Sequence, residues 1–142
     1  MNNENKIIIY QVFTRLFGNN NNHCVYNGDI VTNGCGKMAD FTLKALSEIK
    51  KLGTTHIWYT GIIEHATQTD YRRYNISPDH PAIVKGKAGS PYAIKDYYDV
   101  DPDLANDIPE RMREFENLVR RTHRAGLKVI IDFVPNHVAR QY

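Results

Sequence analysis

Three short segments rich in β-branched and aromatic residues alternate along this chain with two segments of helical periodicity. The strand-like segments are 7–13, 55–60 and 129–133, and the helical segments are 38–52 and 107–125. The mostly apolar run at 7–13 predicts a strand that is buried on both faces. The order strand, helix, strand, helix, strand predicts a parallel sheet with right-handed crossovers, and therefore an α/β fold.

Both helical segments carry boundary signals. The apolar residues of 38–52 follow the helical period, and Gly53 provides a stop. The segment Asp107–Glu110, with a proline in the first turn, predicts a capping box for the second helix, and Gly126 ends that helix. The expected buried stripes are Phe41, Ala45, Leu46, Ile49 and Leu52 in the first helix, and Met112, Phe115, Leu118, Val119 and Thr122 in the second.

The connections between these segments differ greatly in length. Each helix reaches the next strand within a few residues, whereas the strand-to-helix links cover about residues 14–37 and 61–106. Loops beyond about 12–15 residues are uncommon in compact domains and are usually functional. In parallel α/β folds, ligands bind at the carboxyl ends of the strands, where both long links begin. We therefore predict a functional face at that edge; the alternative is a pair of tolerated insertions.

Polar residues follow the third strand-like segment at this edge. Asp132, Asn136 and His137 come directly after it, and Pro135 stiffens the turn between them. An asparagine oxygen suits Ca²⁺, and a histidine can donate a hydrogen bond to a hydroxyl group. The alternative is that Asp132 and Asn136 cap the next turn by side-chain to backbone hydrogen bonds.

The long link at 61–106 is rich in tyrosine. Sugars bind to flat apolar faces with polar groups around the rim, and tyrosine offers both. A link of this length also needs a small core of its own, and that second explanation suits most of these residues. They are Tyr71, Tyr74, Tyr92, Tyr97 and Tyr98.

Charge and hydropathy exclude some classes of partner. Lys plus Arg number 18 and Asp plus Glu 16, so the net charge of +2 gives no support for a nucleic-acid partner. No run approaches the ~20 apolar residues of a membrane span. The polar segment Met1–Lys6 lacks the apolar stretch of a signal peptide, so we expect a soluble chain. Export with a signal already removed stays an open alternative, so the localisation is undetermined.

The two cysteines, Cys24 and Cys35, lie in a stretch rich in glycine and asparagine. Three interpretations are open. They are free thiols, or they form a single disulfide in an exported protein. The third is a metal site that includes His23, although the C-x-x-C spacing typical of zinc sites is missing.

Four segments together resemble the α-amylase family of glycoside hydrolases (family 13). Residues 132–137 read Asp-x-x-x-Asn-His and are similar to the family's signature at the end of barrel strand three. Segments 10–17 and 55–60 resemble its first and second barrel strands, and 92–102 resembles the segment before its second helix. The resemblance implies the N-terminal portion of a (β/α)₈ TIM barrel. Residues 1–142 would be part of one catalytic domain, and 61–106 its long loop after strand two.

The resemblance also implies roles for four residues. Tyr92 would stack on the sugar at the cleavage subsite, and His137 would contact the same sugar. Asp132 would orient an arginine near the catalytic nucleophile. Asn136 stands where the family often binds structural calcium, so calcium is the cofactor that the resemblance implies.

The implied activity is that of a retaining glycosidase that hydrolyses α-glucosidic bonds in starch-type glucans or maltooligosaccharides. Such enzymes use two carboxyl groups about 5–5.5 Å apart. In the family these groups follow barrel strands four and five, and a whole barrel needs about 250 residues. We therefore expect the catalytic carboxylates beyond this chain, which would be inactive alone. Its open sheet edges would pair with the rest of the barrel or with another copy.

Two alternatives to this activity are open. The first is a non-catalytic, sugar-binding or scaffold relative of the same fold. The second is a small flavodoxin-like domain that binds a nucleotide. The second is disfavoured because residues 14–17 replace the glycine-rich turn that such a domain has after its first strand.

Overall fold

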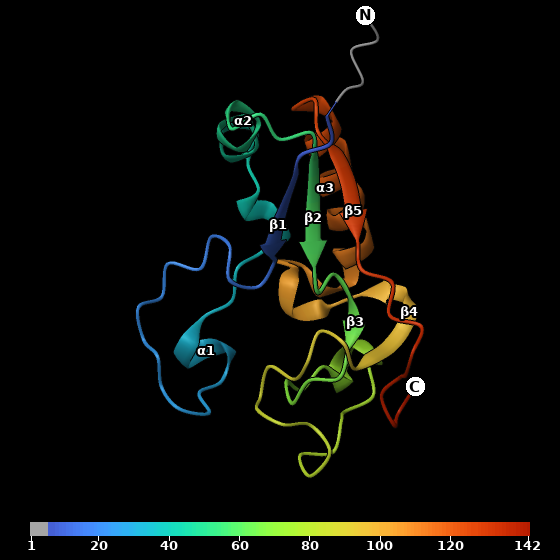
Figure 1. Ribbon diagram of the computed structural model, residues 1–142. Coiled ribbons are helices and arrows are strands. Elements are labelled where there is room, and N and C mark those ends of the chain that lie inside the picture. Colours follow the sequence, from blue (N-terminus) through green and yellow to red (C-terminus); the bar gives the residue numbers. More distant parts are fainter. Residues whose placement is uncertain (1–5) are drawn as a thin grey trace, which may run out of the picture.

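The computed structural model describes residues 6–142 and contains the expected parallel sheet (Figure 1). Its strands are β1 (Ile9–Phe13), β2 (His56–Thr60) and β5 (Lys128–Ile131), in the order β1-β2-β5. Both pairs are parallel, with Ile9 opposite His56 and His56 opposite Lys128. The predicted strand order and direction are therefore confirmed, with strand ends shifted by one or two residues.

The first crossover helix is shorter than its apolar periodicity suggested. Helix α2 spans Leu43–Lys51, and Thr42 caps it by accepting a hydrogen bond from the backbone of Ala45. Before it, residues 38–40 form a separate 3₁₀ turn, η1 (Met38–Asp40). Phe41, Leu46 and Ile49 are buried as predicted, but Leu52 lies past the helix end and is 69% exposed. Gly53 has φ +83°, which confirms it as the stop.

The predicted capping box of the second crossover helix is wrong. Residues 108–110 form a 3₁₀ turn, η4 (Ile108–Glu110), and α3 begins only at Arg111 and runs to Arg124. The side chain of Asp107 makes no capping hydrogen bond. Glu114 from the first turn of α3 instead accepts hydrogen bonds from the backbone amides of residues 106 and 107. In the predicted stripe, Leu118 and Thr122 are fully buried, whereas Met112 is exposed.

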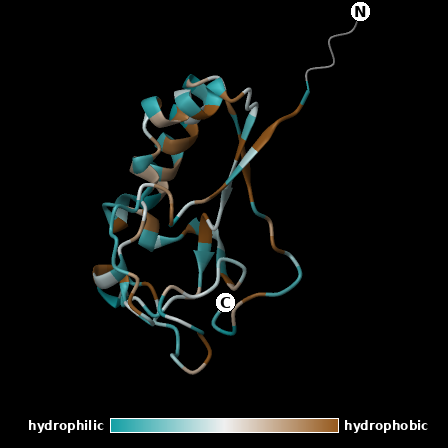
Figure 2. Cartoon of the chain, turned by 60° about the vertical axis from the view of Figure 1, so that its left-hand side comes forward, coloured by the Kyte–Doolittle hydropathy of each residue, from teal (hydrophilic) through white to brown (hydrophobic). Residues whose placement is uncertain are grey.

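The two crossover helices cover one face of the sheet. The core between them contains Val12, Ile57, Tyr59, Leu46 and Leu118. In Figure 2, hydrophobic and hydrophilic residues lie side by side on the helices, as expected for amphipathic helices on a sheet.

No helix within residues 6–142 packs on the other face of the sheet. Alternation along β1 places Ile9 and Gln11 on this open face, and both are exposed. The prediction that segment 7–13 is buried on both faces is therefore wrong for this chain, because helices pack on one face alone.

The long link at 61–106 contains a second sheet that the sequence did not reveal. Strands β3 (Ile63–His65) and β4 (Ile94–Val100) pair antiparallel, with irregular register. Two further 3₁₀ turns, η2 (Arg72–Tyr74) and η3 (Pro102–Leu104), lie in the same link. The first long link holds one short helix, α1 (Ile30–Asn33). Both links lie beyond the carboxyl ends of β1, β2 and β5 (Figure 1), where ligand sites were predicted.

Two further sequence predictions concern the N-terminal segment and membrane-spanning helices. Residues 1–5 of the polar segment Met1–Lys6 lie outside the described part of the chain. Within residues 6–142, every helix is too short or too polar to span a bilayer.

Candidate functional site

Asp132 joins two strands at the carboxyl edge of the sheet. It follows β5, and its carboxylate accepts hydrogen bonds from the indole Nε1 of Trp58 and from the backbone amide of Gly61, the latter at 3.1 Å. Both donors belong to β2 or to the turn after it. Asp132 therefore fixes the ends of β2 and β5 relative to each other, rather than capping the turn that follows it.

Tyr92 lines a cavity of about 480 Å³ at the same edge, which we call the Tyr92 cavity. Its other walls are Gln11, Phe13, Thr60 and Pro91, so the ends of β1 and β2 contribute to it. Gln11 donates a hydrogen bond of 2.9 Å to the hydroxyl of Thr60. Tyr92 is 49% exposed, so an aromatic face is accessible in a cavity that also offers an amide and a hydroxyl.

His137 and Asn136 lie on the exposed segment after β5, outside the walls of the Tyr92 cavity. The Asn136 amide nitrogen is 3.0 Å from His137 Nδ1. The backbone amide of Ala139 donates a hydrogen bond of 2.7 Å to the carbonyl of Ile94. The segment that carries His137 is thus held beside the start of β4, two residues after Tyr92.

Calcium needs more oxygen ligands than these residues supply. Asn136 offers one exposed amide oxygen, whereas Ca²⁺ takes six to eight oxygen ligands. Within residues 6–142 no group of three His, Cys, Asp or Glu side chains is arranged to hold a metal ion. The described residues alone therefore do not fit a calcium site.

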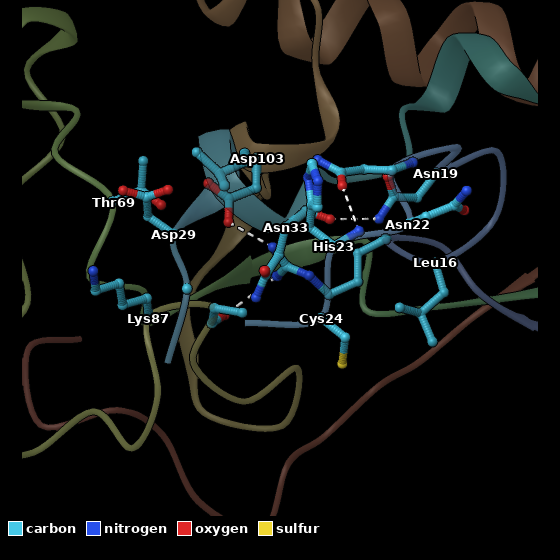
Figure 3. A pocket seen from close by; sticks show the side chains of 16 residues that line it. Leu16, Asn19, Asn22, His23, Cys24, Asp29, Asn33, Thr69, Lys87 and Asp103 are labelled. Carbon is cyan, nitrogen blue, oxygen red and sulfur yellow. Dashed lines mark hydrogen bonds and ion pairs between the residues drawn. The ribbon is translucent and has the colours of Figure 1, made fainter. Parts of the chain in front are cut away.

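A second cavity, of about 440 Å³, lies between the two long links (Figure 3). We call it the loop cavity. Asn22 and His23 from the first link lie on one side in this view, and Thr69 and Lys87 from the second link lie on the other. No local sequence pattern predicts this cavity, because its walls from the first link end at Gly34 and those from the second link begin at Thr69, 35 positions later.

Arg15 and Asp103, which line the loop cavity, belong to a buried ionic network. Arg15 Nη2 lies 3.0 Å from a carboxylate oxygen of Asp103, and the Tyr71 hydroxyl donates a 2.6 Å hydrogen bond to the other oxygen. Lys37 Nζ donates to the backbone carbonyl of Asp103. Burial by itself lowers the pKa of Arg15, but Cys35 and the nearby carboxylates outweigh it and raise that pKa. Burial, together with Asp103, raises the pKa of the Tyr71 hydroxyl.

The carboxylates in and just after β4 are engaged in structural contacts. Asp99 pairs with Arg111 of α3. Asp101 Oδ2 lies 2.8 Å from His65 Nδ1, and both side chains are almost fully buried. Burial lowers the pKa of His65, yet the carboxylate of Asp101 outweighs it, so the net pKa is raised.

Glu64 on β3 gives a testable pH dependence. Burial, with a smaller contribution from Asp99, raises its pKa from 4.5 to about 7. Between these values the folded protein holds a proton that the unfolded chain releases, so stability falls as the pH rises through this interval. Glu64→Gln is therefore expected to raise the free energy of unfolding at pH 8 by on the order of 2 kcal/mol.

The measurement is urea unfolding of both proteins at pH 5 and pH 8. The gain from Glu64→Gln should be far smaller at pH 5, where the Glu64 carboxyl is already mostly protonated in the folded state. His65 is present in both proteins, so its titration cancels in the comparison. The exposed Glu48→Gln serves as the control. An equal gain at both pH values would contradict the assignment to Glu64.

The two cysteines are free thiols, which corresponds to the first of the three interpretations. Cys24 is exposed and lines the loop cavity, whereas Cys35 is half-buried beside Arg15. Burial raises the pKa of the Cys35 thiol to about 11. The disulfide and the metal site with His23 are not present in the described residues.

Comparisons with known proteins agree with the fold and with the motifs. Residues 11–142 match the family model described as "Alpha amylase, catalytic domain". Alpha-amylase 2 of Dictyoglomus thermophilum is 28% identical over 132 residues, which is 93% of this chain and 19% of that protein. The amino acid transporter heavy chain SLC3A1 of Rattus norvegicus is 43% identical over 51 residues, which is 36% of this chain and 7% of that protein.

Solved structures extend the likeness to the fold. The trehalose-6-phosphate hydrolase TreA of Bacillus licheniformis superposes with a TM-score of 0.61 at 25% identity, over 97% of this chain and 18% of that chain. This chain therefore spans less than a fifth of the length of each of these three relatives. The chain belongs to the α-amylase catalytic-domain family, and its three parallel strands and two crossover helices form part of a (β/α)₈ barrel.

Proposed function

We propose that this chain forms the N-terminal, substrate-binding part of a retaining glycosidase that hydrolyses α-glucosidic bonds in starch-type glucans or maltooligosaccharides. The observation that carries the proposal is the Tyr92 cavity, where a half-exposed aromatic ring and two hydrogen-bonding side chains meet at the carboxyl edge of a family-matched sheet. This combination suits a pyranose ring, whose C–H face packs on an aromatic ring while its hydroxyl groups take hydrogen bonds.

We assign to the individual residues the roles that the family resemblance implies. Tyr92 stacks on the sugar, and His137, on the adjoining segment, donates a hydrogen bond to a hydroxyl of that sugar. Asp132 holds the end of β2 against the end of β5, and the end of β2 carries Thr60, a wall residue of the Tyr92 cavity. The Tyr92 cavity is lined by no carboxylate among the described residues. The nucleophile and the acid/base of the proposed reaction therefore belong to parts of the protein outside residues 1–142.

Two further proposals concern partners and cofactors. The outer edges of β1 and β5, which have no strand partner in residues 6–142, pair with the remainder of the barrel or with a second copy of the chain. Calcium, where it binds, takes Asn136 as one ligand of a site that residues outside this chain complete.

The test is sugar binding to the chain itself. Trp58, the only tryptophan in the sequence, lies on the open sheet face with Gln11, so its fluorescence should respond to a ligand at Tyr92. We expect maltotriose to bind and the β-linked cellotriose to bind more weakly. Tyr92→Ala should raise the Kd for maltotriose about tenfold by removing the stacking surface. His137→Ala should raise it less.

Tyr26→Ala is the matched control, because this tyrosine is 99% exposed and lines neither cavity. Its Kd for maltotriose should equal that of the unmodified chain. No response of the unmodified chain to any maltooligosaccharide would overturn the proposed function. We also expect the chain alone to release no reducing sugar from starch, and turnover by it would refute the placement of the catalytic carboxylates elsewhere.

A second candidate is a non-catalytic relative that keeps the fold. The observation in its favour is the match to the amino acid transporter heavy chains, whose name is not that of a hydrolase. The reading frame of the full-length protein separates the candidates, because the enzyme requires carboxylates at the ends of the fourth and fifth barrel strands.

A further inference from the structure

The loop cavity and the Tyr92 cavity are neighbours along two segments of the chain. From β1 onward, Gln11 and Phe13 line the Tyr92 cavity, and Arg15 and Leu16 line the loop cavity. The segment 88–92 likewise contributes Ala88 to the loop cavity and its last two residues to the Tyr92 cavity. A ligand that extends from Tyr92 along these segments would therefore enter the loop cavity.

The asparagines of the first long link fall into two groups, those that bond to the backbone and those whose side chains are exposed. Asn19, Asn21 and Asn33 hold the link together through hydrogen bonds to backbone groups of the same link. Asn22 and His23 are exposed, and their side chains bond to no other described residue. The side chain of Lys87, across the cavity, is unbonded as well within the described chain (Figure 3). Three unengaged polar side chains thus face one hollow from two sides.

The chemistry of the walls suits a neutral polyhydroxyl ligand. The charge of Lys87 is opposed by Asp29, whose pKa is lowered by its hydrogen bonds to Thr32 and, to a smaller extent, by that lysine. An anion would therefore meet a carboxylate. Leu16 is 63% exposed and gives an apolar patch among the donors and acceptors. The volume of about 440 Å³ is in the range of small-molecule sites.

We propose that the loop cavity is a second sugar subsite, which binds glucose units of an α-glucan beyond the two units held in the Tyr92 cavity. The inference rests on the proposed function and adds to it a dependence on chain length. Long maltooligosaccharides reach both cavities and bind more tightly, whereas maltose occupies the Tyr92 cavity alone. Asn22, His23 and Lys87 are the side chains that determine this specificity.

Cys24 provides a reporter inside the loop cavity. It is exposed and lines the cavity, whereas the pKa of Cys35, raised to about 11 by burial, keeps that thiol protonated and slow to react at pH 8. At ten times its Kd, maltoheptaose should slow the alkylation of Cys24 by iodoacetamide about tenfold. Maltose at ten times its own Kd should leave the rate unchanged. The Cys24→Ser variant establishes the background reaction.

Calorimetric measurement of sugar binding to variants of the wall residues tests the same subsite. Asn22→Ala and Lys87→Ala are each expected to raise the Kd for maltoheptaose about fivefold through the loss of a hydrogen bond, and to leave the Kd for maltose unchanged. Asn20→Ala is the matched control, because Asn20 is exposed but does not line the cavity. It should alter neither value.

The outcomes separate the two proposals. Equal affinity for maltose and maltoheptaose, with no protection of Cys24, would overturn the second subsite and leave the proposed function in place. Absence of binding for both sugars would overturn both proposals. Weaker binding of maltose as well as maltoheptaose in the Asn22 and Lys87 variants would show a loss of structure rather than of a subsite, and would also reject the inference.

Discussion

Replacing Asp103 by alanine is expected to lower the free energy of unfolding by about 3–5 kcal/mol, because it leaves the buried charge of Arg15 without its partner. The same change removes the acceptor of the Tyr71 hydroxyl, which is buried. Asp103 is fully buried in the folded protein, so bulk water does not share these interactions. The measurement is urea unfolding followed by far-ultraviolet circular dichroism.

Two comparisons make this result specific to the ionic network. Glu48→Ala removes one partner of an exposed ion pair with Lys51 and should change the stability by less than about 1 kcal/mol. Tyr71→Phe removes one hydrogen bond to Asp103 without exposing a charge, and should cost about 1–2 kcal/mol. If Asp103→Ala proved as mild as Glu48→Ala, the network would not be the connection that holds the two long links together.

The second large effect is expected at Gly89, in the segment that leads to Tyr92. Gly86 and Gly89 both have positive φ, at +75° and +68°. A Cβ atom at Gly89 would lie 1.8 Å from the carbonyl oxygen of Ala66, whereas one at Gly86 would have nothing within 4 Å. Both alanine variants strain the backbone, but Gly89→Ala alone forces the two chain segments apart. We expect it to be less stable than Gly86→Ala by about 1–3 kcal/mol.

Gly89→Ala should also weaken sugar binding, because the displaced backbone carries Tyr92 three residues later. The expected loss of affinity for maltotriose approaches that of Tyr92→Ala, whereas Gly86→Ala binds as the unmodified chain does. Calorimetric titration of both variants, at a temperature where each is folded, gives the comparison. Identical stability and affinity of the two variants would contradict the close approach of residues 66 and 89.

The elements of this fold that depend on local sequence were predictable. The apolar runs and the stops at Gly53 and Gly126 placed three strands and two helices in the right order, because strand and helix periods are written in neighbouring residues. The ends were less certain. Helix α2 begins after its cap Thr42 rather than at residue 38. Near the start of α3, the side chain that accepts hydrogen bonds from backbone amides is Glu114 and not the predicted Asp107, since several nearby polar residues can cap one helix.

The site was predictable only in part. The motif around Asp132 indicated the carboxyl edge of the sheet, but not that its carboxylate binds Trp58, which is 74 residues away in the sequence. Likewise, nothing near Tyr92 in the sequence indicates that Gln11 and Thr60 form the other walls of its cavity.

Local patterns were enough to predict the alternating α/β order, the edge at which both long links begin, and the family to which the motifs point. The pairing of β3 with β4, the burial of Arg15 with Asp103 and the cover of the sheet on one face alone depend on the tertiary fold. The two groups of features differ in the range of the interactions that produce them. Periodicity and turn residues act over a few positions, whereas pairing and burial join residues up to 88 positions apart, whose proximity no local pattern records.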